Sequence, residues 1–258
     1  MVNNTGAIMT RYKVILEYDG TDLIGWQENR QGPSVQSLMK DAIEKFCGAR
    51  PDVVGAGRTD AGVHADGNVA VFDTSARMPA EKMSYALNQR LPEDIRIRKS
   101  EEVAEGFHPR HCDTRKTYEY RIISSSFPIP TKRLYAHYTY LPLDVDRMRR
   151  AAEWLVGEHD FKSFCSAGSQ VETTVRTIYE LEVLQEQEEE ILFRITGNGF
   201  LYNMVRIIAG TLIEVGRGRW EPEYIREILE AKNREKAGPT APACGLMLVN
   251  YCYCSPSH

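Results

Sequence analysis

Between Gly55 and His64 the chain places one carboxylate, one guanidinium and one imidazole among three glycines, in the run Gly55-Ala56-Gly57-Arg58-Thr59-Asp60-Ala61-Gly62-Val63-His64. An aspartate is ionised at neutral pH because the ordinary pKa of its carboxyl is about 3.9, and a neighbouring arginine favours the charged form. Asp60 therefore has the properties of a nucleophile or a base rather than those of an acid. The alternative interpretation is an Asx-turn, in which Asp60 only hydrogen-bonds the backbone of a tight loop.

The glycine spacing in this run does not fit a nucleotide cofactor. Gly55 and Gly57 match the start of a dinucleotide-binding fingerprint, but Asp60 stands where the third glycine belongs, and residues 67–73 predict a strand rather than a helix. No Gly-Lys-Ser/Thr follows, which excludes a P-loop. His64 has no second His or Cys at metal-ligand spacing, so we expect it to hydrogen-bond within the loop. The six cysteines contain no C-x-x-C pair and are expected to be free thiols.

Two tyrosines, Tyr118 and Tyr120, alternate in a segment that predicts a strand, so their rings are expected on the same face. Arg110, Arg115 and Lys116 precede them closely. Aromatic rings beside cations suit base stacking next to phosphates. The same pattern fits two rings that fill a core, because aromatic residues favour strands.

An apolar run from Gly199 to Val215 predicts a helix that carries Arg206 between Val205 and Ile207. A charge buried in such surroundings needs a partner, and Asp60 is the candidate. The alternative is an arginine whose head group extends to the surface.

The composition of the chain limits the classes of protein to which it can belong. The chain has 258 residues, of which 42% are hydrophobic and 26% charged, and no window approaches the ~18 consecutive apolar residues of a membrane span. The first eight residues lack the features of a signal peptide, so we expect a cytoplasmic protein. A net charge of −4 argues against coating nucleic acid by bulk positive charge. A local basic cleft stays open, and its candidate residues are Arg58, Arg110, Arg115, Lys116, Arg176 and Arg206.

The elements that must position these residues form a repeated pattern of the α+β class. The first half predicts the order β-α-β-β-α-β of a ferredoxin-like unit, with strands at 11–19, 52–57, 67–73 and 95–99 and helices after Ser34 and Pro79. The second half predicts a similar order with an extra helix. Its strands are expected at 117–123, 134–140, 175–184, 191–196 and 245–251, and its helices near Asp144, at 199–215 and from Pro222. The acidic run 186–190 is expected to be a solvated hairpin tip. We expect an N-terminal domain over 1–106 and a C-terminal domain over 107–258.

Motifs along essentially the whole chain carry a family resemblance. They are Glu17-Tyr18-Asp19-Gly20, Gly25-Trp26-Gln27, Ser34-Val35-Gln36, Gly57 to His64, Leu87-Asn88, Leu91-Pro92, Phe107-His108-Pro109-Arg110, Tyr118-x-Tyr120, Asp160-Phe161-x-Ser163-Phe164, Met204-Val205-Arg206 and Gly245-Leu246. This set, in this order, resembles the TruA family of tRNA pseudouridine synthases. The loop Ser166–Thr174 and the final cysteine-rich strand look individual to this chain.

The resemblance implies two ferredoxin-like domains with their sheets joined across a central cleft, a homodimer, a tRNA substrate, and neither metal nor organic cofactor. Asp60 matches the family's catalytic aspartate, and Tyr118 matches the tyrosine that packs on the target uracil. Arg206 matches the basic residue that pairs with the aspartate, and Arg58 a position near the target nucleotide's backbone. The implied function is isomerisation of uridine to pseudouridine in the anticodon stem-loop, at positions 38, 39 or 40 of the tRNA.

Two rival functions stand beside this one. A non-catalytic RNA-binding protein shares the ferredoxin-like architecture of RRM domains, but it calls for aromatic RNP-type strands, which we do not find. A carboxylate hydrolase such as a nucleosidase needs a second acid or a metal near Asp60, and Asp66 is the only close candidate. The sequence leaves open whether Asp60 attacks C1′ of the sugar, attacks C6 of the base or assists a glycal route.

Overall fold

A computed structural model describes residues 9–110, 113–168 and 171–253 of the chain. The chain forms two compact units: an N-terminal unit of residues 1–113 and 248–258, and a C-terminal unit of residues 114–247. The first unit thus extends a few residues beyond the boundary predicted at residue 106. It also includes residues 248–253, a return of the chain that the sequence pattern does not signal.

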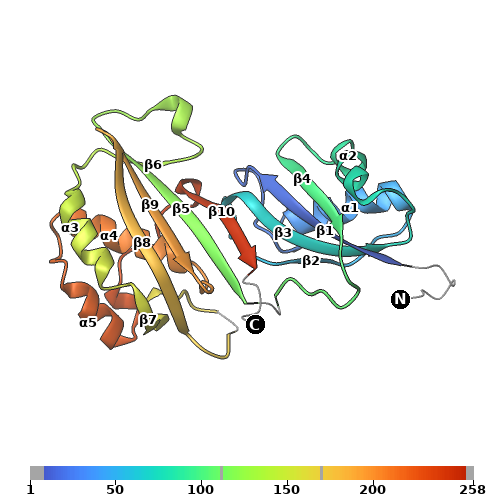
Figure 1. The fold of residues 1–258 in the computed structure, drawn as a ribbon. Helices are drawn as coiled ribbons and strands as arrows, with labels where there is room; N and C mark the ends of the chain where they lie inside the picture. The colour runs from blue at the N-terminus through green and yellow to red at the C-terminus, as the bar shows by residue number, and fades with distance from the viewer. Residues whose placement is uncertain (1–8, 111–112, 169–170, 254–258) are drawn as a thin grey trace. The chain divides into compact units, whose positions relative to one another are not determined.

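The N-terminal unit has the element order β-α-β-β-α-β that its sequence predicts (Figure 1). Its elements are β1 (Thr10–Tyr18), α1 (Val35–Cys47), β2 (Val53–Gly55), β3 (His64–Thr74), the short 3₁₀ turn η1 (Ala80–Lys82), α2 (Met83–Asn88), β4 (Ile95–Glu102) and most of β10 (Leu246–Tyr253). The strands lie in the order β4-β1-β3-β10, and the short β2 pairs with β3 as well. Strand β1 is antiparallel to both β3 and β4.

Alternation in β1 explains how this unit builds its core. Tyr12, Val14, Leu16 and Tyr18 are buried, while the residues between them are less so, because successive side chains in a strand point to opposite faces. Helix α1 begins where the sequence predicts, after Ser34, whose side chain accepts the backbone N–H of Ser37. The helix ends at Gly48, which has a left-handed backbone with φ of 75°.

Strand β10 completes the sheet of the N-terminal unit beside β3. Tyr251 of β10 packs with Ala56 and Val69 in a small hydrophobic cluster, and Tyr253 joins it at the edge. The Tyr251 hydroxyl donates to the backbone oxygen of Pro109 at 3.1 Å. The last described residues of the chain are therefore an integral part of the first unit.

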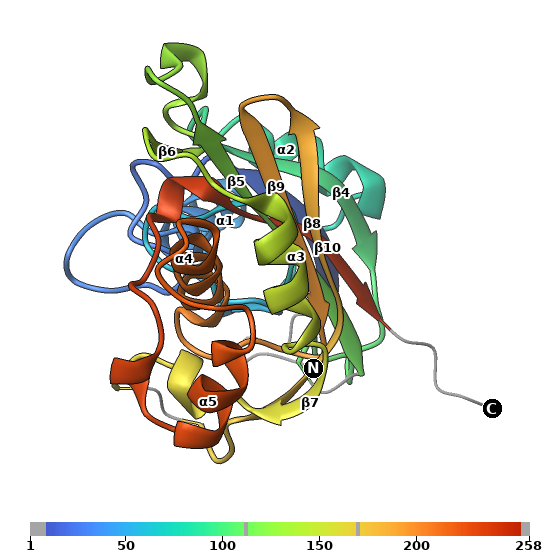
Figure 2. The same cartoon turned by 90° about the vertical axis from the view of Figure 1, so that its left-hand side faces the viewer.

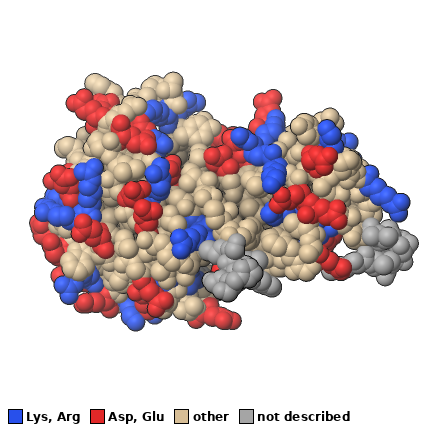
Figure 3. All heavy atoms as spheres, viewed as in Figure 1, with Lys and Arg blue, Asp and Glu red and all other residues tan. Residues whose placement is uncertain are grey.

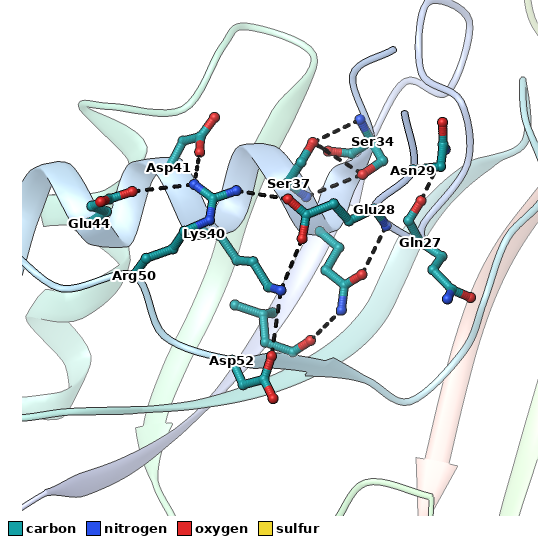
Figure 4. A network of polar contacts seen from close by, with 12 residues as sticks. Gln27, Glu28, Asn29, Ser34, Ser37, Lys40, Asp41, Glu44, Arg50 and Asp52 are labelled. Atoms are coloured by element: carbon teal, nitrogen blue, oxygen red, sulfur yellow. Dashed lines mark hydrogen bonds and ion pairs between the residues drawn. The ribbon is translucent and has the colours of Figure 1, made fainter. Parts of the chain in front are cut away.

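A polar network lies along the exposed side of α1 (Figure 4). Arg50 contacts Glu28 at 2.8 Å and Glu44 at 3.3 Å, and it also pairs with Asp41. Lys40 contacts Glu28 at 3.0 Å and Asp52 at 3.5 Å. These ion pairs, which we call the α1 network, tie the loop before the helix to the segment after it.

The strands of the C-terminal unit lie in the order β5-β9-β8-β7, with β6 parallel to β5. Its elements are β5 (Thr114–Ser124), η2 (Pro130–Lys132), β6 (His137–Thr139), α3 (Val145–Glu153), β7 (Gly157–Asp160), η3 (Phe161–Phe164), β8 (Val175–Gln187), β9 (Glu190–Gly197), α4 (Met204–Gly216), α5 (Tyr224–Ala231), η4 (Arg234–Lys236) and η5 (Ala243–Gly245). Figure 2 shows α3, α4 and α5 in front of these strands. The predicted strand at 134–140 is shorter than expected, because residues 130–136 form η2 and the turn after it.

The helix predicted to start at Gly199 begins at Met204 instead. Asn203 has φ of 60°, a left-handed conformation that cannot continue a right-handed helix. Residues 198–203 therefore form a loop, which we call the 198–203 loop. Every residue of α4 except Arg206 is buried.

The expectation of a solvated tip at residues 186–190 is wrong for Glu190. Glu190 is 4% exposed and its carboxylate pairs with both Arg121 and Lys132. Burial alone raises the pKa of a carboxyl, but the hydrogen bonds from Lys132 and Arg121 outweigh it and lower the pKa of Glu190. The turn itself contains only Glu188 and Glu189, between β8 and β9.

Candidate active site

The segment Ala56–Val63, which we call the Asp60 loop, joins β2 to β3 in the N-terminal unit. Its turn closes where the backbone N–H of Val63 donates to the carbonyl of Asp60 at 3.1 Å. Asp60 is partly buried, whereas Thr59 before it is buried and Arg58 is exposed. A strand and not a helix follows the loop, as the sequence predicts, so the loop lacks the geometry of a dinucleotide site.

A second segment, Gly20–Trp26, is joined to the Asp60 loop by hydrogen bonds between backbone groups. Trp26 N–H donates to the carbonyl of Thr59 at 3.0 Å, and Gly62 N–H donates to Leu23 at 3.2 Å. Gly25 has φ of 68°, and a Cβ added there would lie 2.6 Å from the oxygen of Thr59. Only glycine combines that backbone with so close an approach. The contact explains physically why glycine stands at position 25 next to this loop.

His64 hydrogen-bonds as expected, but from the first residue of β3 rather than from the loop. Its ring is 1% exposed, and Nδ1 accepts the backbone N–H of Gly20 at 3.0 Å. His64 therefore fastens the far end of the Asp60 loop to the segment that also holds Thr59.

Two sequence-predicted cations lie together at the start of the Asp60 loop. Arg110 donates from Nε to the backbone oxygen of Gly55 at 2.7 Å. Burial lowers the pKa of Arg110, and the nearby positive charge of Arg58 lowers it further. The structure thus brings Arg58 and Arg110 to the same side of the loop within this unit.

In the C-terminal unit, the 198–203 loop contacts two of the predicted site residues. The ring of Phe200 meets Tyr118 edge to face, with centroids 5.3 Å apart. The side-chain oxygen of Asn203 accepts Arg206 Nη1 at 2.9 Å, and Arg206 Nε donates to the carbonyl of Ala241 at 2.7 Å. Arg206 is thereby oriented at the first turn of α4.

Tyr120 settles one of the alternatives left open by the sequence. Its ring is 0% exposed, stacks with Phe193 at 6.3 Å, and its hydroxyl donates to the carbonyl of Pro242 at 2.9 Å. Tyr120 is a core residue. Tyr118, two residues earlier in β5, is also buried, at 7% exposed.

The other predicted RNA contacts lie in β5 and β8 of the C-terminal unit. Arg115 stacks over the ring of Tyr179 at 4.6 Å. Arg176 donates to the carbonyls of Thr173 and Val175 at 2.9 and 2.6 Å and lies beside Gly199. Lys116 is half-buried at the start of β5. In Figure 3, positive and negative side chains are mixed over the visible face of each unit.

Sequence reasoning missed the buried polar residues beneath the Asp60 loop. Tyr18 at the end of β1 and Asn68 in β3 are 3% and 0% exposed. The one signal available for Asn68 is a polar residue directly before the apolar stretch Val69–Phe72 of a strand.

Within residues 9–110, 113–168 and 171–253, no group of three or more His, Cys, Asp or Glu side chains is placed to hold a metal ion. No helix in the same ranges combines the length and apolar character needed to cross a membrane. Cys47, Cys165, Cys244 and Cys252 are free thiols, as predicted. Cys112 and Cys254 lie outside the described residues.

Comparison with known proteins gives consistent matches. A family described as tRNA pseudouridine synthase matches residues 14–111 and 151–254. A tRNA pseudouridine synthase A of Brevibacillus brevis is 48% identical over 245 residues, covering 95% of this chain and 100% of that protein. Proteins of the same name from Acetivibrio thermocellus and Thermoanaerobacter sp. are 45% and 43% identical over the same coverage.

Proposed function

The chain belongs to the tRNA pseudouridine synthase family, and on that premise we propose that it isomerises uridine in tRNA with Asp60 as the nucleophile. The observation that carries the proposal is the construction of the Asp60 loop. Residues on either side of Asp60 are held by backbone hydrogen bonds to the Gly20–Trp26 segment. These bonds fix the position of the backbone that carries the Asp60 side chain. A catalytic group gains from such preorganisation because misplacement by about 1 Å costs about 10²-fold in rate.

The reaction needs no external reactant. The N1–C1′ bond of uridine breaks, a C5–C1′ bond forms, C5 loses a proton and N1 gains one, so nothing is oxidised or reduced. A carboxylate serves three routes: attack at C1′, attack at C6, or assistance to a glycal intermediate. The target base must leave its stack, which costs a few kcal/mol.

We assign Tyr118 as the platform for the extruded uracil. Its ring is fixed edge to face by Phe200, so the platform is oriented before RNA arrives. Stacking of a base on an aromatic ring is worth about 1–3 kcal/mol, which offsets part of the cost of extrusion.

We assign Arg206 as the cation that pairs with Asp60 and keeps it charged. It is the single residue of α4 that is not buried, and its guanidinium is oriented by Asn203 and Ala241. A guanidinium held in this way stabilises a carboxylate in surroundings of low dielectric without reorganisation during the reaction.

Arg58 and Arg110 are proposed to contact the RNA backbone. Burial, and after it the nearby charge of Arg58, lower the pKa of Arg110, and a phosphate beside the two guanidinium groups would favour the charged form of Arg110. Arg115, Lys116 and Arg176 are further proposed contacts. Because each neutralised phosphate releases counterions, binding should fall steeply with salt, and a flat salt dependence would count against these contacts.

The finer points of fold and assembly are also proposals. The strand order β4-β1-β3 with β2 beside β3 supports a ferredoxin-like N-terminal unit. We further propose that the C-terminal unit has the same architecture, that the enzyme is a cytoplasmic homodimer, and that its target lies in the anticodon stem-loop.

The test is a variant series assayed on tRNA labelled with tritium at uridine C5, where release of tritium to water reports the reaction. Asp60→Asn should lower kcat on the order of 10³-fold or more while tRNA binding largely survives. Arg206→Met should lower kcat, and Tyr118→Ala should lose more activity than Tyr118→Phe. Pseudouridine formation at a near-normal rate by Asp60→Asn would overturn the nucleophile assignment, and unchanged turnover by Arg206→Met would overturn the pairing.

A further inference from the structure

We propose that Tyr18, Asn68 and Thr59 are positioning residues of the active site, joined in a buried hydrogen-bonded chain that sets the backbone from which Asp60 projects. The inference rests on the proposed role of Asp60 as nucleophile. The chain of contacts runs from the end of β1 to the Asp60 loop and into β3, so it fixes the loop against two central strands of the N-terminal unit.

Asn68 uses its full hydrogen-bonding capacity under the loop. Its side-chain oxygen accepts the backbone N–H groups of Gly57 at 3.3 Å and Val69 at 2.9 Å. Its amide nitrogen donates to the carbonyl of Gly57 at 3.1 Å and to the Tyr18 hydroxyl at 3.0 Å. A side-chain amide offers two donors and two acceptor sites, and all four are occupied here. Asn68 thus holds both polar groups of the Gly57 backbone, at the entrance to the Asp60 loop.

Tyr18 links Asn68 to Thr59, the residue before Asp60. Its hydroxyl accepts from Asn68 and shares a hydrogen bond of 2.8 Å with the Thr59 hydroxyl. Burial raises the pKa of Tyr18 to about 12, partly offset by the bonds from Thr59 and Asn68, so the hydroxyl keeps its proton at neutral pH.

Hydrogen bonds consequently hold both the side chain and the backbone carbonyl of Thr59. Its hydroxyl meets Tyr18, and its carbonyl accepts the N–H of Trp26 at 3.0 Å. A β-branched side chain has few χ1 choices, so a fixed hydroxyl also fixes the backbone of that residue. The peptide that leads into Asp60 has little freedom left, and the carboxylate is aimed mainly by its own two side-chain torsions.

A purely structural role would be served at least as well by apolar residues. Replacing hydrogen-bonded buried groups by apolar groups of the same shape is often nearly neutral for stability, whereas a fully satisfied polar network selects one conformation. The network contacts Gly57 and Thr59 of the loop that carries the proposed nucleophile. A unique loop conformation matters most to the rate at this place.

The first test compares two tyrosines of the same strand. Tyr18→Phe removes the hydroxyl that reaches Thr59. Tyr12→Phe is the matched control, because Tyr12 is also buried in β1, at 2% exposed, but its hydroxyl bonds the carbonyl of Met78 at 3.3 Å, away from the loop. We expect Tyr18→Phe to lower kcat about 10-fold or more, with KM for tRNA within about twofold of wild type, and Tyr12→Phe to leave kcat unchanged. Equal kcat values in the two folded variants would overturn the inference.

The second test changes the other end of the bond and does not depend on whether Tyr18→Phe folds. Thr59→Val keeps the shape of the side chain and loses the hydroxyl, whereas Thr59→Ser keeps the hydroxyl. We expect Thr59→Val to lose kcat and Thr59→Ser to retain most of it. Failure of Thr59→Val to lower kcat would overturn the network's role. Activity in Asp60→Asn would instead overturn the proposed nucleophile, so the two failures are distinguishable.

Discussion

Two polar networks of the N-terminal unit use different chemistry at different depths. The chain of Tyr18, Asn68 and Thr59 is buried and made of neutral hydrogen bonds. The α1 network is made of ion pairs whose partners reach solvent, as in Arg50 and Glu28, both with 38% of the side chain exposed (Figure 4). One network lies beneath the proposed nucleophile and the other lies along a helix.

Exposed ion pairs and buried hydrogen bonds differ in how strictly they fix the backbone around them. An exposed ion pair is screened by water and salt and contributes about 0–1 kcal/mol, so it tolerates loss of a partner. A buried group that loses its partner costs about 1–3 kcal/mol, so the structure either keeps the whole arrangement or changes conformation. Geometry that a reaction depends on is better specified by the second kind.

The largest expected effect comes from exchanging glycines of similar backbone in the two regions. Gly25→Ala places a Cβ 2.6 Å from the Thr59 oxygen on a residue with φ of 68°, whereas Gly48→Ala, with φ of 75°, meets no atom within 4 Å. Left-handed strain alone costs about 1 kcal/mol, and the crowding at Gly25 adds about 1–3 kcal/mol. Urea unfolding should therefore give a loss of about 3 kcal/mol for Gly25→Ala and about 1 kcal/mol for Gly48→Ala.

The two glycine variants should also differ in activity. Gly25→Ala should also lower kcat, because the backbone of Thr59 must move, whereas Gly48→Ala should retain the wild-type kcat. If the two variants lost stability and activity equally, the Gly20–Trp26 segment would have no special role in holding the Asp60 loop.

An effect of intermediate size should appear in the pH dependence of stability. The pKa of Tyr18 is raised from 10.0 to about 12, so its contribution is fully present below pH 10 and is lost as pH rises through about 12. Two pKa units correspond to about 2–3 kcal/mol. Hydrogen bonds from Lys40 and Arg50 lower the pKa of Glu28, whose contribution is present above its unfolded value of 4.5 and is lost as pH falls below it.

Wild-type and Tyr18→Phe proteins, unfolded in urea from pH 9 to 12, should differ by this alkaline loss. The part that remains in Tyr18→Phe belongs to groups such as Tyr120 and Tyr12, whose pKa values burial also raises. A Glu28→Gln variant compared from pH 6 to 3 should show a much smaller difference, because Glu28 is exposed. An alkaline loss as large in Tyr18→Phe as in the wild type would show that Tyr18 does not contribute to it.

The smallest expected effect is loss of the cation at the centre of the α1 network. Arg50→Met keeps an apolar stem and removes contacts to Asp41, Glu28 and Glu44. We expect a loss below about 1 kcal/mol at low salt that disappears at high salt, with kcat unchanged. A loss of several kcal/mol that survives salt would mean that exposed ion pairs specify this unit as strongly as its buried network does.

Much of the fold follows from local chemistry that a single sequence displays. The alternation of β1, the Ser34 cap and the Gly48 stop depend on neighbouring residues, and all three were predictable. The start of α4 was not, because Asn203 adopts a left-handed backbone that no apolar pattern signals. Glu190 looked solvated because its partners Arg121 and Lys132 are distant in sequence.

In the candidate site, too, some residues can be recognised from local sequence and others only from the folded structure. Asp60 stands out by its glycine-rich surroundings, and Arg206 by its place in an apolar helix. Tyr118 and Tyr120 are indistinguishable by spacing. Only the structure shows that Tyr120 is fully enclosed, and that Tyr118, which is also buried, contacts Phe200 of the 198–203 loop. Asn68 contacts Tyr18, which precedes it by 50 residues, so their bond exists only after β1 and β3 pair.

The return of β10 to the N-terminal unit has a consequence for synthesis on the ribosome. Residues 248–253 pair beside β3 and place Tyr251 in the cluster with Ala56 and Val69. Translation therefore delivers the last strand of the first unit only after the whole C-terminal unit has been made. Until then one side of β3 lacks a neighbour along much of its length, and an unpaired edge invites association with other chains. The nascent protein therefore carries an unpaired edge of β3 from the time residue 113 is added until residues 248–253 are made.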